Sequence, residues 1–292
     1  MLNNRFFQIQ IFEKYNSLEV FLKNKELSLL NIRNSFEKKL IYVNKKIASP
    51  KTTLEPGMCI QVFCDEKEKK KYFTENTLQI IHCDPDFLVI NKPYGMTVHS
   101  DFHHEKNNVV FFLKKWLNFS ESEFQNLLPV IHRIDKPTTG IFLLARNPDS
   151  VKYLKFLMKK RIIKKKYLAL VTGQLEKLEF TIKAPLIKPG KQKRARISFA
   201  GKNAETYIKV LKQKNKFALV KCELLTGRTH QIRSHLKFIN HPILNDNLYN
   251  NCQSDFLFLH SYKIEFNYFY KKKNFCFTTP LPFFFKKKLM SE

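Results

Sequence analysis

The chain has 292 residues, with 52 Lys and Arg against 25 Asp and Glu, so its formal net charge is +27. A surplus of this size predicts a polyanionic partner, because each phosphate that a basic side chain neutralises releases counterions. Nucleic acid is the first expectation and an anionic membrane surface the second. No apolar run approaches the roughly 18 residues of a membrane span, which argues against an integral membrane protein.

The cysteines and the N-terminus indicate the cellular compartment. Six cysteines are scattered along the chain without a C-x-x-C pair, which argues against a zinc ribbon or a redox motif. We therefore expect reduced thiols in a cytosol. Residues 1–13 carry polar side chains throughout and have no apolar signal core, so the expected location is cytoplasmic.

Residues 1–64 read as a small unit of their own. Apolar side chains at helical spacing predict one helix around Leu18–Leu22 and a second around Ile32–Phe36. The runs 40–46 and 60–63 predict two strands that follow these helices. Residues 65–77 are strongly charged and lack periodicity, as linkers usually do. The alternative is a helical cap on the main domain.

Residues 78–292 form the second expected domain. Asn147 should cap a helix that runs to about Arg161. The expected strands lie at 78–83, 87–91, 141–145, 167–171, 207–211, 217–224, 263–270 and 274–277. Because strands outnumber helices and several are joined as hairpins, we predict an α+β domain with a largely antiparallel or mixed central sheet.

The string HRIDKPTTGIFLLAR at residues 132–146 is the most informative part of the sequence. Asp135 stands between Arg133 and Lys136, in a Pro/Gly turn just ahead of an apolar run. A charged turn that leads into a buried strand presents one acid in a fixed place. An Asp-Lys-Pro triplet alone would be read as an ordinary polar turn.

A second string, LTGRTHQIRSHL, occupies residues 225–236. Thr229 is expected to N-cap a helix that runs to about Ile239, and Arg228 would give the N-terminus of that helix an anion site. Arg233 would follow one turn later on the same face. His230 and His235 are five residues apart, which is the wrong spacing for a shared metal, so no metal is expected. A solvated basic helix face is the alternative.

Two further segments are basic. The run KKKYLALV at residues 164–171 predicts a strand in which Tyr167 alone would be read as a packed aromatic. Residues 188–196 form a Pro/Gly loop rich in Lys and Arg, which is typical of a segment that tracks phosphates. A disordered, solubilising loop is the other interpretation.

Taken whole, these strings resemble the motifs of the RluA-type RNA pseudouridine synthases, and the resemblance spans residues 78–282. It implies the pseudouridine synthase fold, with Asp135 as the catalytic residue, Arg233 as its ion-pair partner and Tyr167 against the target base. Residues 1–64 resemble, in pattern only, the small RNA-binding module named after ribosomal protein S-four. Asn240, Asn245 and Asn250 stand where the family commonly has glycine; asparagine tolerates positive φ better than other side chains.

The resemblance also implies where RNA is held. Arg133 would help to hold RNA displaced around the flipped nucleotide. The implied RNA-binding residues are His132, Arg133, Lys165, Lys191, Lys193, Arg194, Arg228 and His230. A monomer is expected, with RNA as its partner.

The implied reaction breaks the N1–C1′ bond of a uridine, rotates the uracil and joins it again through C5. No oxidation state changes, so no cofactor is expected. The carboxylate could bond covalently or act through a glycal intermediate, and the sequence leaves both open. Large-subunit ribosomal RNA is the expected substrate. The alternatives are a transfer-RNA synthase of the same family, a non-catalytic RNA-binding or ribosome-assembly factor, and a glycosylase that would release free uracil.

Overall fold

The computed structural model describes most of the chain. The described residues are 6–11, 14–24, 29–44, 46–63, 79–98, 108–109, 113, 131–190, 194–250, 252, 254 and 256–291. The charged linker expected at 65–77 lies outside them, as do Lys191 and Lys193.

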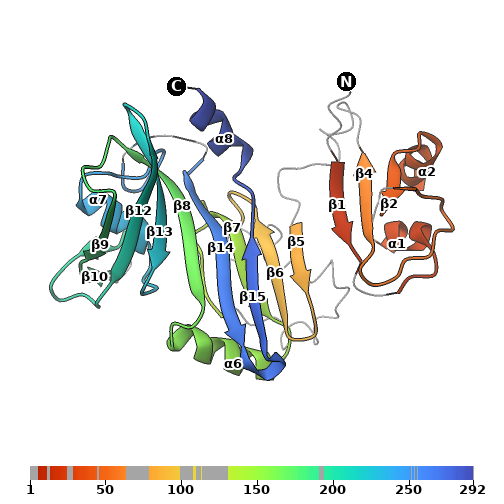
Figure 1. Ribbon diagram of the computed structural model, residues 1–292, viewed down its shortest axis with the longest axis horizontal. Helices are drawn as coiled ribbons and strands as arrows, with labels where there is room; N and C mark the ends of the chain where they lie inside the picture. The colour runs from red at the N-terminus through yellow and green to blue at the C-terminus, as the bar shows by residue number, and fades with distance from the viewer. Residues whose placement is uncertain are drawn as a thin grey trace.

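The N-terminal residues form a four-stranded sheet in the order β1-β4-β2-β3, accompanied by two helices (Figure 1). Its elements are β1 (Phe6–Gln10), α1 (Leu18–Asn24), α2 (Leu29–Glu37), β2 (Ile41–Val43), β3 (Lys46–Ile47) and β4 (Cys59–Phe63). Leu18 and Leu22 of α1 are buried in one cluster with Ile41 and Ile60 of the sheet. The two predicted helices and the strands after them are present, whereas β1 was not predicted.

The large sheet has nine strands within the described residues, in the order β5-β6-β7-β14-β8-β13-β12-β9, with β15 paired to β14. These are β5 (Gln79–Cys83), β6 (Phe87–Lys92), β7 (Thr139–Ala145), β8 (Lys164–Thr172), β9 (Glu179–Lys183), β12 (Glu205–Gln213), β13 (Phe217–Leu224), β14 (Leu259–Tyr268) and β15 (Lys273–Thr278). A separate pair joins β10 (Leu186–Ile187) to β11 (Arg196–Ile197). In the large sheet β7 and β14 pair in parallel and the other pairs are antiparallel. The predicted α+β domain with a largely antiparallel or mixed central sheet is confirmed.

Strands β6 and β7 are buried on both faces, which explains their continuous apolar sequences. Phe87 and Val89 pack into a cluster with α6 (Pro148–Lys159), whereas Leu88 and Ile90 pack with Met96 on the opposite face. A strand covered on both faces has no polar face to alternate with.

The helix predicted after Asn147 is confirmed, because the Ser150 amide donates to Asn147 Oδ1 at 2.8 Å. The cap predicted for the second helix is wrong. Helix α7 (Gln231–Phe238) begins after His230, whose φ of 54° is left-handed and which makes no side-chain cap bond. Arg228 N–H donates to Gln231 Oε1 at 2.9 Å, so the first residue of the helix bonds back to the segment before it.

Two of the three asparagines that replace glycine have positive φ, at 64° for Asn240 and 60° for Asn245, whereas Asn250 does not. The C-terminal helix α8 (Phe283–Met290) packs on the domain, with Phe285 fully buried beside Phe258. Among the described residues no helix is both long and apolar enough to span a bilayer.

Gly140 marks the point where β7 meets β14. Its φ is +104°, and a Cβ there would lie 2.8 Å from the Ser261 carbonyl carbon. Gly95 also has a positive φ, +74°, but a Cβ there would have no neighbour within 4 Å.

We predict that Gly140→Ala lowers the free energy of unfolding by about 3 kcal/mol or more, because backbone strain adds to a main-chain clash. Gly95→Ala, the matched control, should lose only about 1–2 kcal/mol through backbone strain. Chemical denaturation of both variants measures the difference. Equal losses would contradict the close approach of β7 and β14.

Candidate active site

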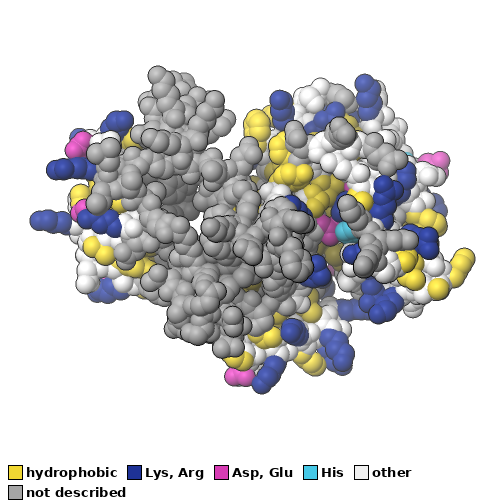
Figure 2. All heavy atoms as spheres, turned by 180° about the vertical axis from the view of Figure 1, so that it is seen from behind, with side chains coloured by type: hydrophobic (Ala, Val, Ile, Leu, Met, Phe, Trp, Pro, Cys, Tyr) yellow, Lys and Arg dark blue, Asp and Glu magenta, His cyan; other side chains and the backbone are white. Residues whose placement is uncertain are grey.

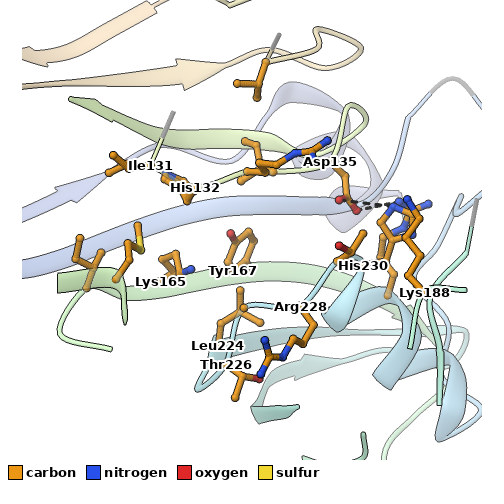
Figure 3. A pocket seen from close by; sticks show the side chains of 18 of the residues that line it. Ile131, His132, Asp135, Lys165, Tyr167, Lys188, Leu224, Thr226, Arg228 and His230 are labelled. Atoms are coloured by element: carbon orange, nitrogen blue, oxygen red, sulfur yellow. Dashed lines mark hydrogen bonds and ion pairs between the residues drawn. The ribbon is translucent and has the colours of Figure 1, made fainter. Parts of the chain in front are cut away.

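Most of the predicted site residues line one cavity of about 1080 Å³ (Figure 3). The loop before β7 supplies Asp135, β8 supplies Lys165 and Tyr167, and the segment from β13 into α7 supplies Arg228 and Arg233. His132, Arg133 and His230 also line it, whereas Arg194 does not. Eight of the predicted side chains, from three separate parts of the chain, therefore face one space.

Arg233 links two carboxylates. Its Nη1 donates to Asp135 Oδ2 at 2.9 Å, while its Nε and Nη2 donate to the two oxygens of Asp246 at 2.8 and 2.7 Å. Burial alone would lower the pKa of Arg233, but the Asp246 hydrogen bonds and the Asp135 charge outweigh it and hold the pKa above its usual range. The guanidinium is therefore a permanent cation beside Asp135.

Asp246 fixes how Arg233 meets Asp135. Asp246 is fully buried, and it also accepts the amides of Leu248 and Tyr249 at 3.0 and 3.1 Å. With Nε and Nη2 directed at Asp246, Arg233 meets Asp135 through Nη1 and Oδ2, and the other oxygen of Asp135, Oδ1, lies 3.8 Å from His230 Nε2. Sequence reasoning missed Asp246; the available signal was that it is the only acid between Glu223 and Asp255.

Tyr167 and Lys165 project from β8 into the cavity. Burial raises the pKa of Tyr167 although a hydrogen bond with Ser261 works against it, so the hydroxyl keeps its proton at neutral pH. Burial lowers the pKa of Lys165. Both residues lie where they were predicted to act, and their roles stay predictions.

The loop that carries Asp135 is hydrogen-bonded to β7 through His132. Its Nε2 accepts the Leu143 amide at 3.1 Å, and its ring lies 4.6 Å from that of Phe142. Burial, with the Lys165 charge, lowers the pKa of His132 to about 3, so the ring is neutral. Arg133 next to it is exposed, in keeping with a predicted contact to RNA.

Lys92, at the end of β6, also holds this loop by hydrogen bonds. It is fully buried, and its ammonium donates to the carbonyls of Pro93, Met96 and Lys136 at 2.9, 2.9 and 3.0 Å. Burial lowers the pKa of Lys92, and the nearby Asp135 charge offsets only part of that effect, so the resulting pKa is about 7. The sequence alone does not indicate that Lys92 holds the Asp135 loop.

The remaining basic residues differ in their surroundings. Arg228 is exposed, and its Nε donates to the Asn203 carbonyl at 3.1 Å. Lys and Arg side chains are spread over the described part of the face in Figure 2, where acidic ones are few. In the part of the chain that the structure describes, no cluster of three or more His, Cys, Asp or Glu side chains could hold a metal ion.

Comparisons with known proteins show the family of the chain. The family described as RNA pseudouridylate synthase matches residues 86–238, just over half of the chain. The chain belongs to that family. Its motifs are those of the RluA type, and members of the family are isomerases that convert uridine in RNA to pseudouridine.

Individual relatives support the assignment. An uncharacterized RNA pseudouridine synthase of Mycoplasma pneumoniae is 40% identical over 176 residues, which cover 59% of this chain and 55% of that protein. The ribosomal large subunit pseudouridine synthase C of Buchnera aphidicola is 31% identical over 269 residues, covering 86% and 83%. Human RNA pseudouridylate synthase domain containing 4 has a TM-score of 0.60 at 28% identity, covering 72% and 91%.

We predict that Asp246→Asn lowers kcat by about a hundredfold and the free energy of unfolding by about 3 kcal/mol. An amide cannot accept both guanidinium N–H groups as a carboxylate does, and one partner of a buried pair is lost. Turnover and denaturation measure the two effects. Asp149→Asn is the control, since the Asp149 side chain is 96% exposed and should change neither. Full activity in Asp246→Asn would contradict the assigned role.

Proposed function

We propose that this protein isomerises one or a few uridines of large-subunit ribosomal RNA and that Asp135 is its catalytic carboxylate. The observation that carries the proposal is the hydrogen bond of 2.9 Å between Arg233 Nη1 and Asp135 Oδ2 inside a basic cavity. A carboxylate that must stay ionised in a partly desolvated site needs such a cation.

Each neighbour has a part in the proposed reaction. Asp135 acts at C1′ of the target uridine while the N1–C1′ bond breaks. The Tyr167 ring stacks on the flipped uracil, and its protonated hydroxyl serves as a donor. Arg133 fills space among the displaced nucleotides, while Lys165 and Arg228 neutralise phosphates.

The choice of ribosomal RNA rests on two supports. Relatives such as the Buchnera aphidicola protein are named ribosomal large subunit pseudouridine synthase C. The net charge of +27 suits a large, structured polyanion. A transfer-RNA substrate remains the other outcome of the experiment below.

Residues 1–64 are proposed as a separate RNA-binding module of the S-four type, ahead of a catalytic domain at 78–292. The support is that these residues have their own four-stranded sheet and their own buried cluster. Such a module would choose the RNA, while the cavity carries out the chemistry.

We predict that Asp135→Asn abolishes pseudouridine formation and changes RNA affinity by less than about threefold, because only one acidic charge is lost from a chain whose net charge is +27. Carbodiimide-based primer extension on ribosomal and transfer RNA, from cells with and without the gene, would map the target. Sites restored by the wild type and not by Asp135→Asn would establish both enzyme and residue. Full restoration by Asp135→Asn would point instead to an assembly factor.

Removal of residues 1–64 should weaken RNA binding by at least about tenfold, and the slope of log affinity against log salt should become shallower. The chemical step, measured in single turnover at saturating enzyme, should change little. Thermal unfolding of the shortened protein is the folding control. Binding as tight as that of the full chain would show that the front segment is no RNA-binding module.

A further inference from the structure

The His230 ring is held in one orientation beside Asp135 (Figure 3). Its backbone is left-handed just before α7, and its Nδ1 lies 3.2 Å from the Tyr249 hydroxyl. The ring meets the Tyr249 ring edge-on, with centroids 5.8 Å apart. The opposite nitrogen, Nε2, lies 3.8 Å from Asp135 Oδ1. One edge of the ring is thus anchored, and the other faces the cavity.

The hydrogen bonds around Tyr249 determine which nitrogen of His230 carries the proton. The Tyr249 hydroxyl donates its one proton to the Ala195 carbonyl at 2.9 Å and accepts the Ala195 amide at 2.9 Å. It can therefore meet His230 Nδ1 only as an acceptor, so Nδ1 bears the hydrogen. In the neutral ring Nε2 then presents a lone pair to the cavity.

The ring is neutral at physiological pH. Burial lowers the pKa of His230; among the charged groups around it, Arg233 and Lys188 lower the pKa further, whereas Asp135 and Asp246 raise it. Two acceptors, Nε2 and Asp135 Oδ1, consequently face the same space without a hydrogen bond between them. A group that donates a proton belongs there.

The proposed reaction supplies such a group. If Asp135 acts at C1′, as the proposed function requires, the adjacent C2′ brings its hydroxyl next to that carboxylate. A 2′-hydroxyl is a donor, and it is the group by which proteins distinguish RNA from DNA at a given nucleotide.

We propose that His230 Nε2 accepts a hydrogen bond from the 2′-hydroxyl of the target uridine and makes the enzyme selective for ribose at that position. Tyr249 is the positioning residue that holds the imidazole in the accepting tautomer. Ala195, directly before β11, fixes the Tyr249 hydroxyl through its amide and its carbonyl. The proposal rests on Asp135 being the catalytic carboxylate.

The test compares two stem-loop RNAs that carry the mapped uridine, one all-ribose and one with a single 2′-deoxyuridine at the target. For the wild type, the deoxy change should lower kcat/KM by about tenfold, the effect of one hydrogen bond. His230→Phe keeps a ring but has no acceptor, so it should respond to the deoxy change by less than about twofold. Comparing the two responses cancels any intrinsic effect of the missing hydroxyl on reactivity.

Two further comparisons complete the test. Tyr249→Phe should respond to the deoxy change by an intermediate factor, because the tautomer is no longer fixed. A 2′-deoxy substitution at a neighbouring nucleotide should affect wild type and His230→Phe alike. If His230→Phe turns over too slowly, the same comparison is made on its Kd for the pseudouridine-containing RNAs, with and without the 2′-hydroxyl.

An equal response in the wild type and His230→Phe would overturn the proposal, as would a wild type that ignores the deoxy change. Failure of the proposed function looks different. In that case the wild type forms no pseudouridine in the all-ribose RNA, or Asp135→Asn turns it over at full rate.

Discussion

The division of one guanidinium between two carboxylates governs the geometry of this site. Arg233 is nearly buried and Asp246 is fully buried, so their pairing takes place where water can no longer stabilise either charge. A bidentate fork is the arrangement in which arginine compensates best for that loss. Asp246 therefore fixes the orientation of the Arg233 guanidinium, and Arg233 Nη1 holds Asp135 by a single hydrogen bond to Oδ2. Asp135 Oδ1 is left facing His230 Nε2 at 3.8 Å.

The loop that carries Asp135 has little regular structure, and two buried contacts give it a fixed place. His132 joins it to the Leu143 amide in β7, and Lys92 joins it to the turn after β6. The first contact requires a neutral ring, and burial ensures that state. In the second contact, three N–H groups of Lys92 bond three carbonyl oxygens. A lysine side chain has three N–H groups only in its charged, ammonium form. Asp135 thus stands on a loop whose position is set by strands on either side of it.

Local sequence predicted the elements of this fold well where the hydrophobic pattern was strong. The hairpin of β12 and β13 and the capped helix α6 follow from periodicity and turn residues alone. The start of α7 did not, because the N-cap residue is His230 rather than Thr229 and makes no side-chain cap bond. His230 has a left-handed backbone, a conformation that the local sequence did not indicate.

Most of the site residues could be named from motifs, but their connections could not. Asp135 and Arg233 are 98 positions apart, and Lys92 is 44 positions from the carbonyl of Lys136 that it bonds. Separations of this size are set by the sheet order, in which β14 enters between β7 and β8. Asp246 was missed for another reason: its partner Arg233 is only 13 positions away, on a helix, but nothing adjacent to Asp246 in the sequence indicates a buried acid.

The basic side chains are of two physical kinds, and the difference bears on how RNA is held. Those on the surface, such as Arg133, are solvated and contribute to general attraction. Lys165 is inside the cavity, where burial lowers its pKa, and within the described residues no carboxylate forms a salt bridge with it. A half-buried cation without a salt bridge is unfavourable in the free protein. A phosphate beside Lys165 would remove that penalty, so under the proposed function the charge inside the cavity adds to the general attraction from the surface.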